Sequence, residues 1–454
     1  MDDPVLLSRI QFAITVGFHF LFPPISIGLA WLLVFIEHRA WRTGDPVWER
    51  MGRFYGKLFG LTFAIGVATG IVMEFQFGSN WAAYSRYVGD VFGSMLAAEG
   101  MFAFFLESGF LGLYLLGRNR LPRGLHWFSI LMVATGATIS AFWILVANSW
   151  QQTPAGHVIV NGRAELASFF DAVFNPSTLP RFNHTMAAAL VAGSFFMGGV
   201  AAFMLIRGKA TDVARRALVV ALAVGAISSV LAAFPTGHEH AQQVARTQPE
   251  KFAAIEGLYE TEKGAPLVFF ALQKADPPRL EAAIRIPKVL SWLAFGDPDA
   301  EIHGIDKFRH EDLPPLWLPF VSFHNMVLLG LLFQGVAFLG LLLHWRGKLH
   351  TSRRFWWLML ATSPLPLVAI QFGWVAAEVG RQPWVVYRLL RTSDAVSATV
   401  TAGEVWTSMI AFGLVYLVLL AIYLGVIWHK ASKGPDDLPA GKADVAGPAA
   451  AEVR

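Results

Sequence analysis

Long runs of apolar residues alternate with short polar connections along this chain, from near its first residue to about residue 430. A run of about 20 apolar residues is long enough to cross a bilayer as an α-helix. Nine such runs occur, at residues 9–37, 54–76, 92–116, 125–149, 184–207, 214–234, 316–344, 355–378 and 404–429. The pattern therefore predicts an all-α polytopic membrane protein with about nine transmembrane helices.

Lysine and arginine cluster in every second connection between these runs, and such clusters favour the cytoplasmic side of a membrane. The clusters follow the odd-numbered runs and consist of Arg39, Arg42, Arg50 and Arg53; Arg118, Arg120 and Arg123; Arg207, Lys209, Arg215 and Arg216; Arg346, Lys348, Arg353 and Arg354; and Lys430 and Lys433. The N-terminus is therefore predicted to lie outside and the C-terminus in the cytoplasm.

Two segments depart from the alternation. Residues 235–315 form a charged, proline-containing connection on the predicted outer side, far longer than ordinary connections. Residues 431–454, rich in Ala, Gly, Pro and Asp, are predicted to be disordered. The expected units are thus helices one to six over 1–234, an outer loop over 235–315, helices seven to nine over 316–430, and the tail.

Composition supports the membrane assignment. Hydrophobic residues make up 55% of the chain and charged residues only 15%, whereas soluble domains carry about 25% charged residues. Cysteine is absent, which excludes disulfides and thiolate metal sites. The first run is too long for a signal peptide and lacks a small-residue cleavage site, so it is interpreted as the first span. Membrane lipid is an expected neighbour, and nucleic acid is not.

Glu74, Glu99 and Glu107 lie inside or beside the second and third apolar runs. A carboxylate at membrane depth costs at least about 2.5 kcal/mol, so each is a candidate functional group. In a regular α-helix the eight residues between Glu99 and Glu107 place them about 80° apart around the axis. They would share one face, and we predict that they form a proton relay.

Histidine, methionine and glutamate from five runs fall in the outer half of the predicted bilayer, namely His19, Glu99, His184, Met326 and Glu378. Imidazole and thioether are haem iron ligands, and carboxylates bind iron or carry protons. Each residue also has an ordinary explanation, since Met fills gaps in apolar cores and an intramembrane His can be a hydrogen-bonded packing residue. The shared depth indicates a redox protein, a proton-coupled transporter or an ion pathway.

A set of motifs extends over residues 1–430 and narrows these alternatives. They are SRIQFAITVGFHFLFPP, GVATG, MEFQFGSNW, YVGDVFG, EGMFAFFLES, ISAFWILVANSWQ, FNHT, QPEKFAAIE and GWVAAEVGRQPW. Together they closely resemble subunit I of the cytochrome bd-type quinol oxidases, including the cyanide-insensitive branch. The loop over 235–315 resembles the short form of that family's quinol loop.

The resemblance implies a respiratory oxidase subunit in the bacterial inner membrane that oxidises quinol at the outer face and reduces O2 to water. Protons for water would come from the cytoplasm, which generates a proton-motive force without a pump. The implied cofactors are two b-type haems plus a haem d or a third b-type haem. The implied partners are a second membrane subunit and a small accessory single-helix subunit.

The resemblance also implies haem ligands. His184 and Met326 match the axial ligands of the low-spin b haem. His19 and Glu378 match ligands of the two high-spin haems, and Glu99 matches a residue at or beside the iron of that pair.

Further roles are carried over from the matching motifs. Glu107 and Ser140 match a proton path from the cytoplasmic side. Trp374 matches an aromatic residue between haems, and Arg381 is a candidate partner for a haem propionate.

Lys251 and Glu256 match quinol-site residues, although a salt bridge on a solvated helix would explain the same pair. At position 324 this chain has His, whereas family members with the longer quinol loop tend to have Arg. That Arg would stabilise the reduced low-spin haem and a neutral His would do so less, so the resemblance leaves the reduction potential of this haem open. His324 would also be an alternative to Met326 as an iron ligand.

Two other functions are alternatives to the oxidase. A proton-coupled transporter would show inverted repeats and broken helices in two halves, and neither is evident in the sequence. A haem-bearing quinol dehydrogenase would lack oxygen chemistry.

Overall fold

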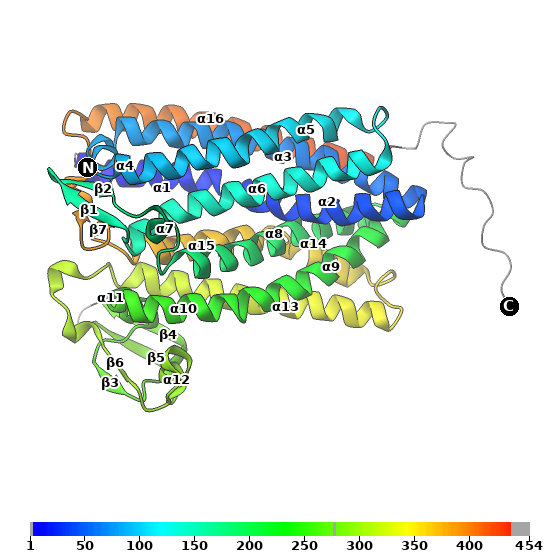
Figure 1. The fold of residues 1–454 in the computed structure, drawn as a ribbon. Helices are drawn as coiled ribbons and strands as arrows, with labels where there is room; N and C mark the ends of the chain where they lie inside the picture. The colour runs from blue at the N-terminus through cyan, green and yellow to red at the C-terminus, as the bar shows by residue number, and fades with distance from the viewer. Residues whose placement is uncertain (1–2, 276–277, 437–454) are drawn as a thin grey trace.

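The computed structural model describes residues 3–275 and 278–436, and its helices form one elongated bundle with small hairpins at one end (Figure 1). Within these ranges, nine helical segments are long and apolar enough to cross a membrane: Pro4–Thr43, Pro46–Ser79, Ala82–Gly117, Arg123–Gln152, Thr178–Ile206, Thr211–Thr247, Trp317–Trp345, Arg353–Val379 and Ala402–Lys433. The predicted fold class is confirmed. Of the predicted tail, residues 437–454 lie outside the described ranges.

The nine spans are built from thirteen helices and one π-helical turn, Gly100–Phe104. The helices are α1 (Pro4–His19), α2 (Pro23–Thr43), α3 (Pro46–Ser79), α4 (Ala82–Glu99), α5 (Phe105–Gly117), α6 (Arg123–Gln152), α8 (Thr178–Ile206), α9 (Thr211–Ala233), α10 (Thr236–Thr247), α13 (Trp317–Trp345), α14 (Arg353–Thr362), α15 (Leu365–Val379) and α16 (Ala402–Lys433).

Short elements cap the end of the bundle that carries the N-terminus (Figure 1). They are α7 (Phe169–Val173), α11 (Pro249–Glu256), α12 (Val289–Phe295), and antiparallel pairs of β1 (His157–Val160) with β2 (Arg163–Leu166), β3 (Glu262–Lys263) with β6 (Glu301–Ile302), β4 (Leu267–Ala275) with β5 (Pro278–Ile286), and β7 (Trp384–Val386) with β8 (Leu390–Arg391). The segment predicted as an outer loop thus contains α10, α11, α12 and two of these strand pairs, β3–β6 and the β4–β5 hairpin, and α10 continues the sixth span.

Four spans are interrupted, which the apolar pattern did not predict. The first span breaks between His19, the last residue of α1, and Pro23, the first residue of α2. Proline has no backbone N–H to donate within a helix, so it starts a new helix here. The sixth and eighth spans break in the same way at Pro235 and Pro364.

The third span contains the π-helical turn Gly100–Phe104, directly after Glu99. Its hydrogen bonds run from i to i+5, so the turn takes up one more residue than an α-helical turn. Glu99 and Glu107 are therefore about two turns apart on nearly the same side of the span. The angle of about 80° between Glu99 and Glu107 that a regular α-helix predicts is therefore wrong. The π-helical turn brings the two side chains closer to one side of the span.

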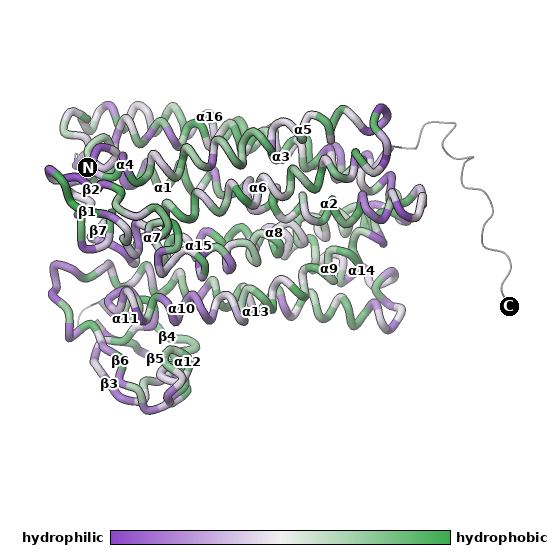
Figure 2. The backbone as a smooth tube through the Cα atoms, in the orientation of Figure 1, coloured by the Kyte–Doolittle hydropathy of each residue, from purple (hydrophilic) through white to green (hydrophobic). Residues whose placement is uncertain are grey.

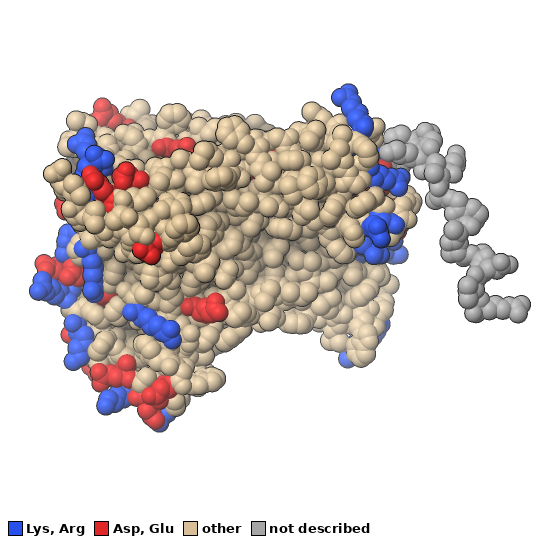
Figure 3. Space-filling model, in the orientation of Figure 1, with Lys and Arg blue, Asp and Glu red and all other residues tan. Residues whose placement is uncertain are grey.

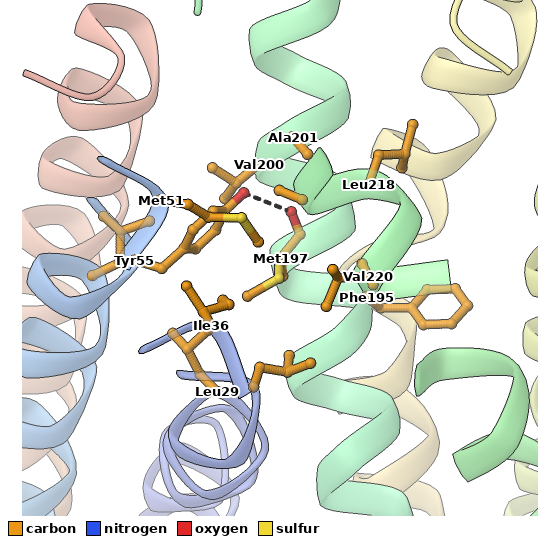
Figure 4. Close-up of a cluster of buried hydrophobic side chains, with 14 of the residues drawn as sticks. Leu29, Ile36, Met51, Tyr55, Phe195, Met197, Val200, Ala201, Leu218 and Val220 are labelled. Atoms are coloured by element: carbon orange, nitrogen blue, oxygen red, sulfur yellow. Dashed lines mark hydrogen bonds between the residues drawn. The ribbon is translucent and has the colours of Figure 1, made fainter. Parts of the chain in front are cut away.

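Close packing of α2, α3 and α8 forms the central core (Figure 4). The Tyr55 hydroxyl donates a hydrogen bond to the Met197 carbonyl oxygen at 3.1 Å, inside this apolar cluster. A Cβ added to Gly28 would lie 2.2 Å from the Ala189 carbonyl oxygen, and one added to Gly193 would lie 2.5 Å from the Gly28 carbonyl carbon. These small residues let the two helices touch along their backbones, as is common in membranes.

Hydropathy and charge follow the long axis of the bundle. The spans are mostly hydrophobic along their length and hydrophilic at their ends (Figure 2). Lysine and arginine dominate the visible charges at the end opposite the N-terminus, whereas both signs of charge mix at the N-terminal end (Figure 3).

Candidate functional site

His19 lies at the break in the first span, where it faces α3. Its Nδ1 is 3.0 Å from the Thr69 hydroxyl oxygen. That hydroxyl donates to the Ile65 carbonyl oxygen at 2.9 Å, so it accepts from His19. The proton therefore sits on Nδ1, and Nε2 keeps the lone pair with which neutral imidazole binds metals. A Cβ on Gly70 would lie 3.2 Å from His19 Cε1, so this glycine makes room for the ring.

His184 is held in the same way in the first turns of α8. Its Nδ1 is 3.1 Å from the Ala232 carbonyl oxygen. A carbonyl oxygen only accepts, so Nδ1 carries the proton and Nε2 has the free lone pair. The ring packs against Gly237 and lies 5.7 Å from the ring of His240, both on α10. Two histidines from separate spans thus each keep the Nε2 lone pair, through which a neutral imidazole could bind iron.

Met326 on α13 faces a glycine of α15. A Cβ on Gly373 would lie 2.7 Å from the Met326 sulfur, which is too close for any real side chain. Helices α13 and α8, which carry Met326 and His184, both contact α9 and α15. Trp374, next to Gly373, lies 6.3 Å from the ring of Phe20 at the break in the first span.

His324 has both ring nitrogens next to backbone carbonyl oxygens. Nδ1 is 2.9 Å from the Phe320 oxygen, and Nε2 is 3.0 Å from the Val268 oxygen on β4. A carbonyl oxygen only accepts, so a neutral His324 donates to one of the two, and each ring nitrogen faces a backbone oxygen and not the Met326 side chain. The alternative in which His324 replaces Met326 as a ligand is therefore disfavoured, and His324 instead ties α13 to the outer loop.

Glu378, near the end of α15, is the centre of a buried polar network. Its Oε1 accepts from Asn148 at 3.1 Å and from Gln152 at 3.0 Å, and its Oε2 is ion-paired with Arg381. Arg181 lies 4.0 Å from Oε1 and donates to Asn148 at 2.8 Å. A carboxylate has about four lone-pair positions, so one position on Oε2 is left for a metal.

Lys251 joins this network from the outer loop. The side chain is 3% exposed, and its amine donates to Gln152 and, at 2.6 Å, to Gln248. Burial lowers the pKa of Lys251 well below its usual range, and Arg181 lowers it further. The stem covers Gly380, where a Cβ would lie 2.9 Å from Lys251 Cγ. Lys251 therefore points at the Glu378 network.

Glu256 points elsewhere, into an apolar cavity of about 200 Å³ between α10, α11, α12, β4 and α13. Its Oε2 is buried and has no hydrogen-bond partner within the described residues. Burial raises the pKa of Glu256 to about 8. The polar residues that share the cavity wall with it are His238, Gln242 and His324. The two residues predicted at the quinol site thus lie in different environments.

Glu99 and Glu107 both face α6. The Ser140 hydroxyl donates to Glu99 Oε1 at 2.6 Å. One turn earlier on α6, a Cβ on Gly136 would lie 3.1 Å from the Glu107 Cβ. The π-helical turn and α6 therefore hold Glu107, Ser140 and Glu99 along a single line through the bundle.

The residues present fit a haem in three respects. Two histidines have Nε2 available, and Gly373 leaves room for the Met326 sulfur because it has no side chain. The buried Nε atoms of Arg181 and Arg381 have no hydrogen-bond partner among the described residues. Guanidinium N–H groups of this kind pair with carboxylates such as propionates.

Sequence reasoning missed Thr69, Asn148, Gln152 and Arg181. The histidine partner Thr69 is an ordinary residue in a membrane helix, and nothing in its local sequence distinguishes it. Asn148, Gln152 and Arg181 lie at the ends of apolar runs, where polar residues are expected. Of these four residues, only Arg181 could have been noticed in the sequence, because it is a cation three residues before the candidate ligand His184.

Over nearly its whole length the chain is similar to known proteins. The family cytochrome bd terminal oxidase subunit I matches residues 7–435. Cytochrome bd ubiquinol oxidase subunit 1 of Bacillus subtilis (strain 168) is 39% identical over 443 residues, which cover 95% of this chain and 94% of that protein. Cytochrome bd-II ubiquinol oxidase subunit 1 of Escherichia coli (strain K12) is 36% identical, with 93% and 96% covered. The solved bd oxidase of Geobacillus thermodenitrificans aligns with a TM-score of 0.89 and 31% identity, over 96% of this chain and 100% of that one.

Proposed function

This chain belongs to the cytochrome bd terminal oxidase subunit I family, and from that premise we propose how its residues divide the work of a quinol:O2 oxidoreductase. The protein is a multi-pass subunit of a bacterial respiratory oxidase. One observation carries the residue assignment: two spans each hold a histidine with Nε2 free, and the network around Glu378 lies at the same end of the bundle. The family match excludes the transporter alternative, although the spans do contain breaks.

We assign three haems to the chain, two of b type and a third of d or b type. His184 and Met326 would hold the low-spin b haem, and His19 and Glu378 the high-spin pair, with Glu99 beside an iron. Arg381 and Arg181 would bind propionates through their buried N–H groups. Once bound, the haems supply electron transfer and oxygen activation. Trp374 would stand between them.

The end of the bundle with the N-terminus faces outside in this proposal. Support comes from the basic side chains at the opposite end, which the positive-inside rule assigns to the cytoplasm (Figure 3). Protons for water then enter from the cytoplasmic side and pass Glu107 before Glu99, with Ser140 orienting the Glu99 carboxyl group. Quinol releases its protons at the outer face, so turnover generates a proton-motive force.

Quinol would bind in the cavity beside Glu256, under the outer loop 235–315, which is the short form of the quinol loop. The cavity is mostly apolar, as a quinone ring requires, and Glu256 is the one carboxylate among the described residues of its wall. An unpartnered carboxylate oxygen there can take the hydroxyl proton as quinol is oxidised, which is general-base catalysis.

The oxidase requires a second membrane subunit in this proposal, and a small single-helix subunit would be accessory. Large apolar side chains on the third and ninth spans are exposed in the isolated chain, including Phe102, Phe105, Leu116, Leu414 and Leu417. Lipid or a partner subunit would cover them.

The assignment is tested by the reduced-minus-oxidised visible spectrum of the purified complex and by oxygen uptake with a reduced quinol. Haem bands together with uptake support it. Haem bands without uptake would favour the quinol dehydrogenase, and no haem bands would refute the assignment.

The pH dependence of quinol oxidation is expected to report Glu256. Only the ionised carboxylate accepts a proton, so kcat/KM should rise with pH and level off above about 8. Glu256→Gln should lower kcat/KM by about 100-fold or more and remove this rise. Glu260→Gln, an exposed residue nearby, is the control. Retention of the pH-dependent rise in Glu256→Gln would show that another base operates.

Lys251 is expected to act through Gln152 and Glu378 and not by contact with quinol. Lys251→Met should change the visible spectrum of the high-spin haems and lower kcat, while the KM for quinol stays within about twofold. Lys263→Met, at an exposed site on β3, should leave both unchanged. A raised KM for quinol with an unaltered spectrum would instead show that Lys251 contacts quinol.

A further inference from the structure

We propose that α12 and the β4–β5 hairpin of the outer loop lie in the outer leaflet of the membrane, at the boundary between lipid head groups and acyl chains. The loop would then be a membrane-embedded flap, and the cavity beneath it would open sideways into lipid. The lipid contact is inferred from the exposed apolar side chains of α12 and the hairpin. Only its consequence for quinol access rests on the proposed quinol site.

Helix α12 has two apolar faces. Leu290, Ser291 and Ala294 are buried against the loop. On the opposite face Trp292 is 56% exposed and Phe295 is 40% exposed. A short helix with its polar backbone packed on protein and two aromatic side chains turned outward is typical of an interfacial segment. Tryptophan in particular favours the head-group level of a bilayer.

The hairpin extends this apolar surface. Its large exposed side chains are Phe269, Phe270 and Leu272 on β4, and Ile284 and Ile286 on β5. Strand β4 contacts α12, so these side chains and the aromatic residues of α12 concentrate exposed apolar area on neighbouring elements, which proteins seldom leave in water. Arg285 stands between the two isoleucines, and a long side chain there can reach a lipid phosphate while its stem stays in apolar surroundings.

The position of the patch identifies lipid as the occupant. Strand β4 contacts α13, and α12 contacts α10. Figure 1 shows both elements beside the outer part of these spans and not beyond the helix ends. Val327 and Leu328 of α13 are exposed on the span itself and also line the cavity. The apolar surface of the span therefore continues without a break onto the loop.

The charge distribution agrees with this depth. In Figure 3 charged side chains of both signs gather toward the end of the molecule that carries the N-terminus. Glu301 and Lys263 of the β3–β6 pair are exposed. Arg279 and Glu281 of the β4–β5 hairpin are also about half exposed and form an ion pair. The loop thus carries exposed charges next to the exposed apolar side chains of α12, β4 and β5, as a segment at the boundary between lipid head groups and acyl chains requires.

The absence of cysteine from the chain permits a direct test. Trp292→Cys and Phe295→Cys, each in the complete oxidase in lipid nanodiscs, would carry a nitroxide label, with Glu301→Cys as the matched control and the unaltered complex as the labelling blank. Molecular oxygen, which concentrates in lipid, should relax the labels at 292 and 295 more strongly than a water-soluble nickel chelate, and the order should reverse at 301. Equal exposure of all three sites to the nickel chelate would overturn the proposal. Protection of 292 and 295 from both reagents would also overturn it, because a partner protein would then cover the patch.

A second measurement addresses quinol access. Trp292→Ser combined with Phe295→Ser should raise the KM for a long-chain quinol several-fold and leave the KM for a short-chain, water-soluble quinol unchanged. Neither residue lines the cavity. Equal KM values for both quinols in the variant would refute the access role. Failure of the quinol site itself would show separately, as an unaltered pH profile in Glu256→Gln.

Discussion

Replacing Met326 by leucine is expected to abolish the absorption of the low-spin haem and to lower quinol oxidase activity at least about tenfold. Leucine fills nearly the same volume as methionine, so the change should cost less than about 1.5 kcal/mol of stability. The thioether sulfur would nevertheless be lost, and leucine offers no atom that binds iron. The reduced-minus-oxidised spectrum and the haem content per complex measure the effect.

Two further variants sharpen this result. Met359→Leu removes a buried sulfur from α14, where it packs against Gly198, and should leave the spectrum unchanged. Gly373→Ala keeps Met326 but places a methyl group 2.7 Å from its sulfur, so the sulfur must move and the low-spin band should shift or weaken. An unaltered spectrum in Met326→Leu would rule out the ligand assignment.

Glu107→Gln is expected to slow turnover by about 100-fold or more and to leave the haem content intact. The amide has the shape of the carboxylic acid but cannot release and regain a proton at physiological pH. Glu107 lies in α5 beside Gly136, about two turns from Glu99, so it should pass protons on without touching a haem. Oxygen uptake gives the rate, and the dithionite-reduced spectrum gives the haem content.

Glu107→Asp, which keeps a titratable group, should recover part of the rate. Ser140→Ala should slow turnover less than Glu107→Gln, since it removes one hydrogen bond to Glu99 and no proton carrier. Full activity in Glu107→Gln would remove Glu107 from the proton path.

The apolar pattern predicted the nine spans correctly, because burial in lipid requires long uninterrupted apolar runs. It did not predict the breaks at Pro23, Pro235 and Pro364 or the π-helical turn after Glu99. Hydropathy averages over about 19 residues, so a change of one or two residues in backbone geometry does not affect it. The break at Pro23 matters most for the site, since it leaves His19 at the end of a helix.

The candidate site residues, like the spans, could be predicted only in part from the sequence. His19, His184, Glu99 and Glu378 could be singled out because such side chains are costly or unusual inside a membrane. Met326 could not, because methionine is common in apolar cores, and only the resemblance to the oxidase family pointed to it. Their partners could not, because threonine, asparagine and glutamine near helix ends are common and become significant only when another helix brings a histidine or carboxylate to them. Lys251 and Glu256, five residues apart on one short helix, point into different environments, which spacing alone did not reveal.

Sequence by itself thus determined the membrane class, the number of spans and the kinds of side chain that could bind iron or carry protons, because each of these depends on the local cost of placing a residue in lipid. Tertiary structure decided which histidine nitrogen is free, that Lys251 hydrogen-bonds with Gln152 beside Glu378, and that Glu256 borders an apolar cavity under the outer loop. These properties depend on contacts between residues far apart in the chain, where a shift of one ångström makes or breaks a hydrogen bond.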